Sequence, residues 1–363
     1  MKVPFLDLKA QLEKIKPELL VKINYIVESG QYVLGKEVND FEKEIAEYLG
    51  VKHAIGCASG SDALLLSLMA LDIKEGDEVI TSPFTFFATA GAIVRLGAKP
   101  VFVDIDKDTY NLDVSLVEKA ISNKTKAIMP VHIFGQSCNM DKLLEISKKH
   151  DLKIIEDACQ AIGAEFNNKK VGTIGDLGCY SFFPTKNLGG MGDGGLVVTN
   201  NDSLAEFLRK ARVHGSQKKY HHEFVGFNSR LDALQAGILR VKLKHLDDWN
   251  NSRISIAKNY TEILKNKFKI PYVQENCKHV FHQYALLAKS EDERTQIMNK
   301  LKAKEVACGI YYPIPLHLQE CFKYLGYKEG DLPVTEEICK RIFSLPIYPE
   351  VDYEKVLEVF SKK

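Results

Sequence analysis

An apolar stretch that ends in two acids, Ile154-Ile155-Glu156-Asp157, is the first place where the sequence could do chemistry. The stretch predicts a buried strand, so Asp157 should lie at its carboxyl end, where the ligand sites of α/β proteins are found. Gln160 follows three positions later and would share a face with Asp157 if a helical turn begins there. Alternatively, Asp157 caps that turn. This segment by itself leaves both interpretations open.

A lysine lies between a Pro-Thr turn and a glycine-rich segment in Ser181-Phe182-Phe183-Pro184-Thr185-Lys186-Asn187-Leu188-Gly189. Lys186 is not on an obvious solvated helix face. An amine that is desolvated or close to another cation can form a Schiff base with an aldehyde. Most lysines are nevertheless surface residues, so this segment alone does not assign a role to Lys186.

A third segment, Ser59-Gly60-Ser61-Asp62, lies between a predicted strand and a predicted helix. Backbone N–H groups at such a helix start, together with the hydroxyl of Ser61, could bind a phosphate group. Simple helix capping explains the same residues. The sequence contains neither GxGxxG nor GxxxxGK[ST], so a dinucleotide site or a P-loop finds no support.

Two further segments carry side chains that suit a flat, anionic ligand. Phe86, in Thr85-Phe86-Phe87-Ala88-Thr89, follows a predicted strand and could stack on a ring, although aromatic residues there are more often core. Asn228 and Arg230 begin a long predicted helix and suit contacts with an anion. Capping explains the asparagine equally well.

Alternating strands and helices are predicted to position these segments. We expect strands at 53–57, 78–81, 100–104, 126–131, 152–156, 177–183 and 195–199, and helices at 61–71, 86–97, 113–121, 139–150 and 202–212. This alternation implies βαβ units and a mainly parallel sheet. A polar loop at 214–229 should precede a long helix at 230–246 and another from 250.

The last part of the chain has a different pattern. A strand at 280–288, a helix at 291–303, a strand at 308–312 and a helix at 334–342 indicate a smaller α+β unit. At roughly 150 residues per domain, 363 residues suggest two domains. We place them at 1–248 and 249–363.

The composition argues against several classes of protein. The 49 basic and 48 acidic side chains leave a net charge of +1, which gives no electrostatic footprint for nucleic acid or an anionic membrane. No apolar run approaches the ~18 residues of a membrane span, and the first residues do not resemble a signal peptide. The eight cysteines form no CxxC pair, so neither a metal site nor a disulfide framework is expected. We expect a soluble, cytoplasmic protein with reduced thiols.

The order and combination of these segments are more specific than any one of them. SGSDAL, EDACQA, SFFPTKNLG, GDGG and GFNSRLDALQA together resemble pyridoxal-phosphate enzymes of fold type I. More narrowly, they resemble the DegT/StrS-type sugar aminotransferases, which act on nucleotide-linked keto-sugars. The resemblance runs from Val3 to Pro346. It implies an α/β fold with a mainly parallel seven-stranded sheet sandwiched by helices, plus a smaller C-terminal α+β domain.

The resemblance also implies a role for each candidate residue. Lys186 would bind pyridoxal 5′-phosphate as an internal aldimine and then act as general base and acid. Asp157 would keep the pyridine nitrogen protonated, which makes the ring an electron sink. The other expected cofactor contacts are Gln160 at the ring hydroxyl, Phe86 stacked on the ring, Gly60, Ser61 and Ser181 at the phosphate, and Asn228 from the partner subunit of a homodimer with shared active sites.

The expected reaction is a ping-pong transamination with L-glutamate as the usual donor. Relatives with histidine in place of the lysine remove a hydroxyl, so Lys186 favours transamination. The KYHH, NSRLDALQA and YYPIPLH segments resemble enzymes that aminate C3 of dTDP-3-keto-6-deoxyhexoses. The expected substrate contacts are Lys218, Lys219, Tyr220, His221, Arg230, Tyr312 and His317.

Three alternatives stay open, one of which is a different pyridoxal-phosphate reaction such as racemisation or elimination. Relatives that act on UDP-2-acetamido-3-keto-glucuronate share NSRLD, in which the arginine meets the sugar carboxylate, so Arg230 leaves that substrate open. A protein of another class, a regulator that binds pyridoxal phosphate or a sugar nucleotide without turnover, is disfavoured because Lys186, Asp157 and Gln160 are all present.

Overall fold

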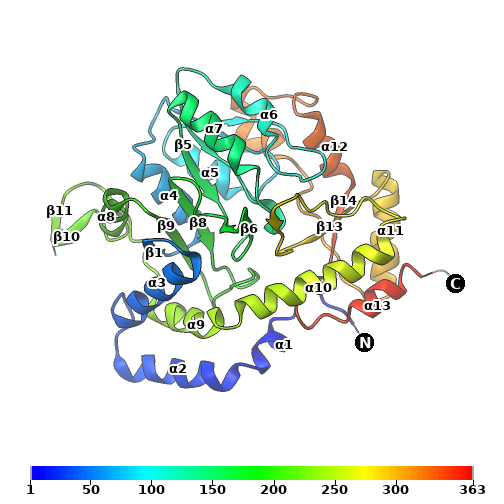
Figure 1. Cartoon of the computed structure of the whole chain (residues 1–363), viewed down its shortest axis with the longest axis horizontal. Coiled ribbons are helices and arrows are strands. Elements are labelled where there is room, and N and C mark those ends of the chain that lie inside the picture. Colours follow the sequence, from blue (N-terminus) through cyan, green and yellow to red (C-terminus); the bar gives the residue numbers. More distant parts are fainter. Residues whose placement is uncertain (1, 219, 362–363) are drawn as a thin grey trace.

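One central sheet of seven strands organises the larger part of the chain (Figure 1). The computed structural model describes residues 2–218 and 220–361. The strand order is β1-β9-β8-β5-β4-β2-β3. Within the described residues, only β9 of this sheet runs antiparallel to its neighbours. The bounds are β1 (His53–Cys57), β2 (Glu78–Thr81), β3 (Lys99–Phe102), β4 (Thr125–Met129), β5 (Lys153–Asp157), β8 (Leu177–Ser181) and β9 (Gly195–Thr199). The mainly parallel seven-stranded sheet is thereby confirmed.

Helices cover both faces of this sheet, because its strands carry apolar residues on both sides. Ile154 belongs to the core that the sheet shares with α3, α7 and α9, whereas Ile155 belongs to the core shared with α4, α5 and α8. Since successive side chains alternate along a strand, Glu156 and Asp157 face opposite layers. The helix bounds are α3 (Lys36–Leu49), α4 (Gly60–Ala70), α5 (Ala88–Arg95), α7 (Met140–His150), α8 (Asp202–Ala211) and α9 (Ala233–Leu243).

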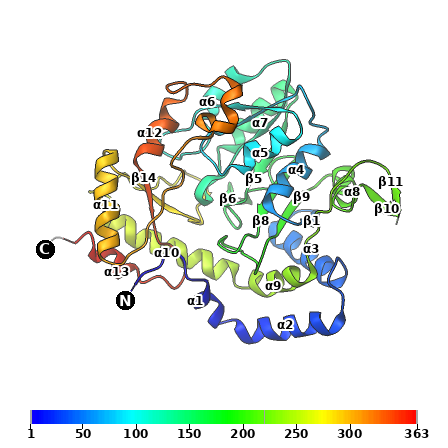
Figure 2. The same ribbon diagram turned by 180° about the vertical axis from the view of Figure 1, so that it is seen from behind.

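The C-terminal part is a smaller α+β unit with its own core (Figure 2). β13 (Tyr284–Leu287) pairs antiparallel with β14 (Ile342–Leu345). The helices around them are α11 (Glu291–Ala303), α12 (Pro333–Arg341) and α13 (Tyr353–Glu358), and α10 (Leu246–Leu264) leads from the larger part into this unit. The expected boundary between residues 248 and 249 falls in the first turn of α10 and stays a prediction.

Some elements differ from the sequence-based expectation. Residues 308–312 form no strand but only a single bridge between Gly309 and Ser344, because the chain turns there so that Tyr312 reaches the site described below. The loop at 214–229 contains a hairpin of β10 (Ser216–Lys218) and β11 (His221–His222). The remaining elements are α1 (Leu8–Glu13), α2 (Lys16–Ser29), α6 (Val114–Val117), β6 (Glu165–Phe166), β7 (Lys169–Lys170) and β12 (Cys277–Lys278), with short 3-10 turns at 118–120, 133–135, 316–318 and 320–325.

None of the helices within the described ranges is both long and apolar enough to cross a membrane.

Candidate active site

The carboxyl ends of four strands meet at one edge of the sheet, and candidate residues lie at or just after each of them. Gly60 follows β1, Phe86 follows β2, and Asp157 and Ser181 end β5 and β8. Because β1, β2, β5 and β8 run in the same direction, these ends lie on the same edge. The fold therefore gathers residues that are distant in the sequence.

Asp157 is almost completely buried, and both of its carboxylate oxygens accept hydrogen bonds. Oδ1 accepts from the backbone N–H of Cys159 at 3.2 Å, and Oδ2 accepts from the hydroxyl of Thr89 at 2.8 Å. A buried carboxylate needs such donors to offset its desolvation. Asp157 therefore has a fixed orientation at the mouth of β5.

The amide of Gln160 is held by two hydrogen bonds. Its Oε1 accepts from the backbone N–H of Phe134 at 2.9 Å, and its Nε2 donates to the hydroxyl of Tyr312 at 2.9 Å. The backbone donor determines which end of the amide is oxygen. The second N–H of Nε2 is left to donate to a ligand oxygen, as a ring hydroxyl contact requires.

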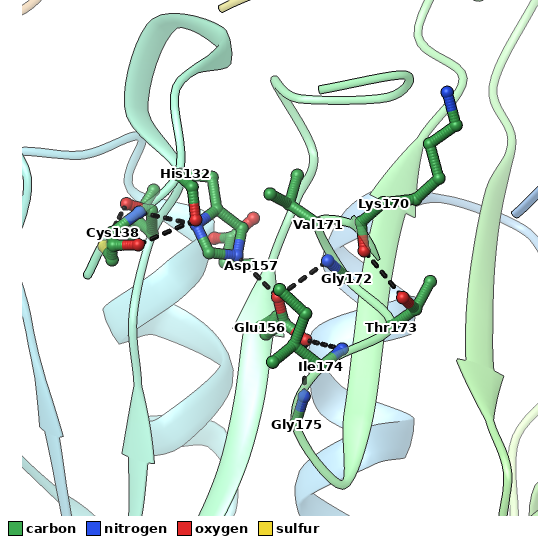
Figure 3. A network of polar contacts seen from close by, with 12 residues as sticks. His132, Cys138, Glu156, Asp157, Lys170, Val171, Gly172, Thr173, Ile174 and Gly175 are labelled. Atoms are coloured by element: carbon green, nitrogen blue, oxygen red, sulfur yellow. Dashed lines mark hydrogen bonds and ion pairs between the residues drawn. The ribbon is translucent and has the colours of Figure 1, made fainter. Parts of the chain in front are cut away.

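Glu156, on the opposite face of β5, belongs to a buried network that ties three segments together (Figure 3). Oε1 accepts from the N–H groups of Ile174 and Gly175, both at 2.6 Å. Oε2 accepts from Gly172 N–H at 2.7 Å and from His132 Nε2 at 2.8 Å.

The protonation of the His132 ring follows from its two contacts. Its Nδ1 accepts from the N–H of Cys138 at 3.1 Å, so Nε2 carries the proton that is donated to Glu156. This ring therefore connects β5 to the segment that supplies Phe134 N–H to Gln160.

Lys186 lies in the loop after β8, and its side chain is partly buried. Desolvation lowers the pKa of its amine, whereas the nearby Cys159 and Asp157 act in the opposite direction. A lowered pKa leaves more of the amine unprotonated, which is the form that attacks a carbonyl carbon. The amine is thus close to Asp157 and suited to nucleophilic chemistry.

Two other groups fix the lysine loop. Asn187 donates to Asn250 Oδ1 at 2.8 Å and to the carbonyl of Val280 at 3.1 Å, and it accepts from His282 Nδ1 at 3.2 Å. Lys242 of α9 donates to the carbonyl of Gly189, and burial lowers the pKa of Lys242 to about 8. The backbone on the C-terminal side of Lys186 is therefore anchored to α9, α10 and the C-terminal part.

The start of α4 and the end of β8 form a cradle for an anion. Ser59 caps α4 by accepting from Asp62 N–H at 3.1 Å. A Cβ atom at Gly60 would lie 2.6 Å from Cβ of Ser181, so only glycine permits this close approach. The first N–H groups of a helix lack intrahelical acceptors and favour phosphate. With Lys186 nearby, the cradle fits a cofactor that carries both a phosphate and an aldehyde.

Both aromatic residues after β2 are largely exposed, but within the described residues only Phe87 stacks on another ring. Phe87 stacks on Phe322 with ring centroids 5.4 Å apart. Phe86 remains 57% exposed. Because Thr85 and Thr89 connect this segment to Asp157, Phe86 lies at the same edge of the sheet and is available to a flat ring.

The expected substrate contacts lie in different places. Tyr312 is in the site through Gln160, whereas His317 is buried against Glu336 at 3.0 Å. Arg230 is half-buried at the approach to α9. Lys218, Tyr220 and His221 belong to the β10–β11 hairpin, which projects from the body beyond α8 (Figure 1). Lys219 lies outside the described residues.

Asn228 is exposed and pairs with Val213 through a single bridge. The structure therefore brings Gly60, Phe86, Asp157, Gln160, Ser181, Lys186 and Tyr312 to one edge of the sheet; Ser61 lies next to Gly60, in the first turn of α4. It does not bring the hairpin residues of the same chain to that edge.

Sequence reasoning did not select Thr89, Glu156, Lys242 or His282. A buried acid directly beside Asp157 and a threonine four positions after Thr85 were visible signals.

In the described part of the chain, no three His, Cys, Asp or Glu side chains gather in a way that could hold a metal ion.

Several known proteins are similar to this chain. The sequence profile of the DegT/DnrJ/EryC1/StrS aminotransferase family matches residues 13–362. A "pleiotropic regulatory protein" of Geobacillus stearothermophilus is 50% identical over 100% of this chain and 98% of its own length. A dTDP-3-amino-3,6-dideoxy-alpha-D-galactopyranose transaminase of Aneurinibacillus thermoaerophilus is 45% identical over 98% of this chain and 97% of its own length.

A UDP-N-acetyl-3-dehydro-alpha-D-glucosamine 3-aminotransferase of Acidithiobacillus ferrooxidans is 43% identical over 98% of this chain and 96% of its own length. Among solved structures, S. venezuelae DesV in complex with a ketimine intermediate superposes with a TM-score of 0.96 at 40% identity. That match covers 99% of this chain and 97% of the DesV chain.

Proposed function

Because this chain belongs to the DegT/DnrJ/EryC1/StrS aminotransferase family, we propose that it transfers the amino group of L-glutamate to C3 of a dTDP-linked 3-keto-6-deoxyhexose. At the coarser level it is a pyridoxal-phosphate-dependent nucleotide-sugar aminotransferase. The observation that carries the proposal is the desolvated amine of Lys186 close to the buried carboxylate of Asp157.

Each residue of the site has a proposed task. Pyridoxal phosphate supplies an aldehyde and a ring that delocalises the electrons of a broken C–H bond. Lys186 would hold the aldehyde, and its freed Nζ would afterwards move a proton between the amino acid Cα and the former aldehyde carbon of the cofactor. Asp157 would hold the ring through its nitrogen. The remaining contacts would be Gln160 at the ring hydroxyl, Phe86 on the ring face, and Gly60, Ser61 and Ser181 at the phosphate.

The proposed sugar substrate rests on the names of relatives and on the segments around the site. The dTDP-3-amino-3,6-dideoxy-galactopyranose transaminase at 45% identity and the DesV structure at 40% identity support a dTDP-linked substrate. The UDP-linked 3-keto sugar of the relative at 43% identity supports a second candidate, and Arg230 would suit the carboxylate of a UDP-linked uronate.

A regulator without turnover finds support in the names of two relatives, the one at 50% identity and a sensory transduction protein of Saccharopolyspora erythraea at 41% identity. The hydrogen bonds at Asp157 and Gln160 and the lowered pKa of Lys186 favour an enzyme instead. All eight cysteines are free thiols, and a cytoplasmic location would suit them.

A substrate panel tests the proposed function. We expect purified holoprotein to lose the absorption of its bound cofactor with L-glutamate and to recover it with a dTDP-3-keto-6-deoxyhexose. Turnover with the dTDP-3-keto-6-deoxyhexose should be about tenfold or more faster than with UDP-linked 3-keto or dTDP-linked 4-keto sugars. A substrate that leaves buried polar groups of the site unpaired loses at least that factor in rate. A preference for a UDP-sugar would overturn the proposed substrate. A holoprotein that does not respond to glutamate would overturn the proposed enzymatic activity.

We also propose a homodimer with shared active sites. Asn228 is exposed, and the adjoining segment carries Val225 at 91% and Tyr220 at 82% exposure. Exposed apolar side chains of this kind indicate an interface. A second copy placed there would bring Asn228 and the β10–β11 hairpin to the site of its partner.

Mixing two inactive variants tests the shared sites. Lys186→Ala and Asn228→Ala chains, refolded together, should recover about a quarter of the wild-type activity, since half of the dimers are mixed and each holds one intact site. The matched control mixes Lys186→Ala with Gln160→Ala, because both residues belong to the same chain's site, and this pair should recover nothing. Equal results for the two mixtures would contradict sites shared through Asn228.

A further inference from the structure

A chain of hydroxyl groups leads from the loop after β2 to Asp157. Thr85 and Thr89 lie 2.9 Å apart through their Oγ1 atoms, and Thr89 Oγ1 lies 2.8 Å from Asp157 Oδ2. Both threonines are buried, with exposed fractions of 2% and 1%. Their spacing of four positions follows the turn that leads into α5, which begins at Ala88.

The direction of these hydrogen bonds can be derived. An ionised carboxylate only accepts hydrogen bonds, so the single proton of the Thr89 hydroxyl is donated to Asp157. The oxygen of Thr89 can then only accept from Thr85, which must be the donor between the two hydroxyls. Hydrogen bonds in such a chain polarise one another, so Thr85 strengthens the bond that Thr89 donates.

We propose that Thr89 is a positioning residue for Asp157, with its hydroxyl fixing the plane of the carboxylate and stabilising its negative charge. This rests on the proposed role of Asp157 at the cofactor ring. With Oδ1 held by Cys159 N–H and Oδ2 by Thr89, the carboxylate cannot rotate. Without the hydroxyl, Oδ2 would lose its donor in a buried environment, and the carboxylate would be free to turn away from the ring.

A purely structural role predicts a different outcome, and the chain contains a matched control for it. Thr335 of α12 donates its hydroxyl to Asp104 Oδ1 at 2.6 Å, and both residues are buried. Asp104 lies just beyond the edge strand β3, outside the proposed cofactor contacts. Thr335→Val and Thr89→Val therefore remove the same kind of bond at two different sites.

The experiment compares Thr89→Val, Thr89→Ser and Thr335→Val with the wild type. Valine keeps the shape of threonine without the hydroxyl, and serine keeps the hydroxyl. We measure the Kd of the apoprotein for pyridoxal phosphate, the single-turnover rate with glutamate, the KM for glutamate and the urea midpoint of unfolding.

Thr89→Val should weaken cofactor binding by about tenfold and slow the single turnover by about ten- to a hundredfold. This is the range expected for the loss of one hydrogen bond to a charged group. The KM for glutamate should stay within about twofold, because no donor-binding group is touched. Thr89→Ser should return both quantities to within about threefold of the wild type. Thr335→Val should lower the urea midpoint as Thr89→Val does, without altering cofactor affinity.

Wild-type cofactor affinity and turnover in Thr89→Val would overturn the inference, and so would equal losses in Thr335→Val. Failure of the proposed function is a separate result, because it appears as a wild-type holoprotein that does not respond to glutamate. The cofactor affinities of the three variants still decide the role of Thr89 in that case.

Discussion

Replacing Lys186 with alanine is expected to abolish covalent cofactor attachment and to reduce turnover by at least about 10³-fold, since both the nucleophile and the proton carrier are lost. The fold should persist, because desolvation lowers the pKa of the Lys186 amine, so its removal takes away a charge that the partly buried position disfavours. The free energy of unfolding in urea should stay within about 1 kcal/mol of the wild type.

Borohydride reduction followed by peptide mass analysis provides the direct measurement. The wild-type holoprotein should carry the reduced cofactor on the peptide that contains residue 186. Lys242 is the internal comparison, because it is also buried, has a lowered pKa of about 8 and contacts the same loop at Gly189. Labelling at Lys242, or at no lysine, would contradict the assigned attachment point, as would wild-type turnover in Lys186→Ala.

The alternation of strands and helices could be predicted because its signals are local. The strands expected at 53–57, 78–81 and 195–199 have those bounds in the structure. Helix α2 was not predicted, because it buries only Leu19 and Ile26 while Leu20, Val21 and other apolar residues of it stay exposed. Its apolar residues therefore lack the clear periodicity of a helix packed on a core.

In the candidate site, too, some residues could be predicted from local sequence signals and others could not. Asp157 was selected because it ends a predicted strand, at the edge where parallel strands place their sites, and Lys186 because it lies between a Pro-Thr turn and a glycine-rich segment. The groups that hold them come from remote segments. Thr89 is 68 positions from Asp157, and Lys242 is 53 positions from Gly189. No local pattern indicates these pairs, because the packing of α5 and α9 against the sheet creates them.

Replacing Asp157 with asparagine should leave the fold intact and the cofactor still able to bind, though about tenfold or more weakly as in Thr89→Val, while slowing the glutamate half-reaction by about 10²- to 10⁴-fold. Asparagine is nearly isosteric: its carbonyl oxygen can accept from the N–H of Cys159, and its NH₂ group can donate to the hydroxyl of Thr89, which can also accept. It carries no charge, however, so it cannot hold a proton on the ring nitrogen by ion pairing, and the ring becomes a weaker electron sink. Stopped-flow absorbance with saturating glutamate measures the rate.

The neighbouring acid supplies the control, because Glu156 has the same charge but faces the other side of β5. All four of its partners are donors, namely His132 Nε2 and the N–H groups of Gly172, Ile174 and Gly175. In Glu156→Gln an NH₂ group would face at least one of these donors, which should cost about 3 kcal/mol of folding free energy. We expect lower stability in Glu156→Gln and slower proton transfer in Asp157→Asn. If Asp157→Asn instead unfolds at the lower urea concentration and reacts at the wild-type rate, Asp157 is a structural residue and the ring nitrogen has another partner.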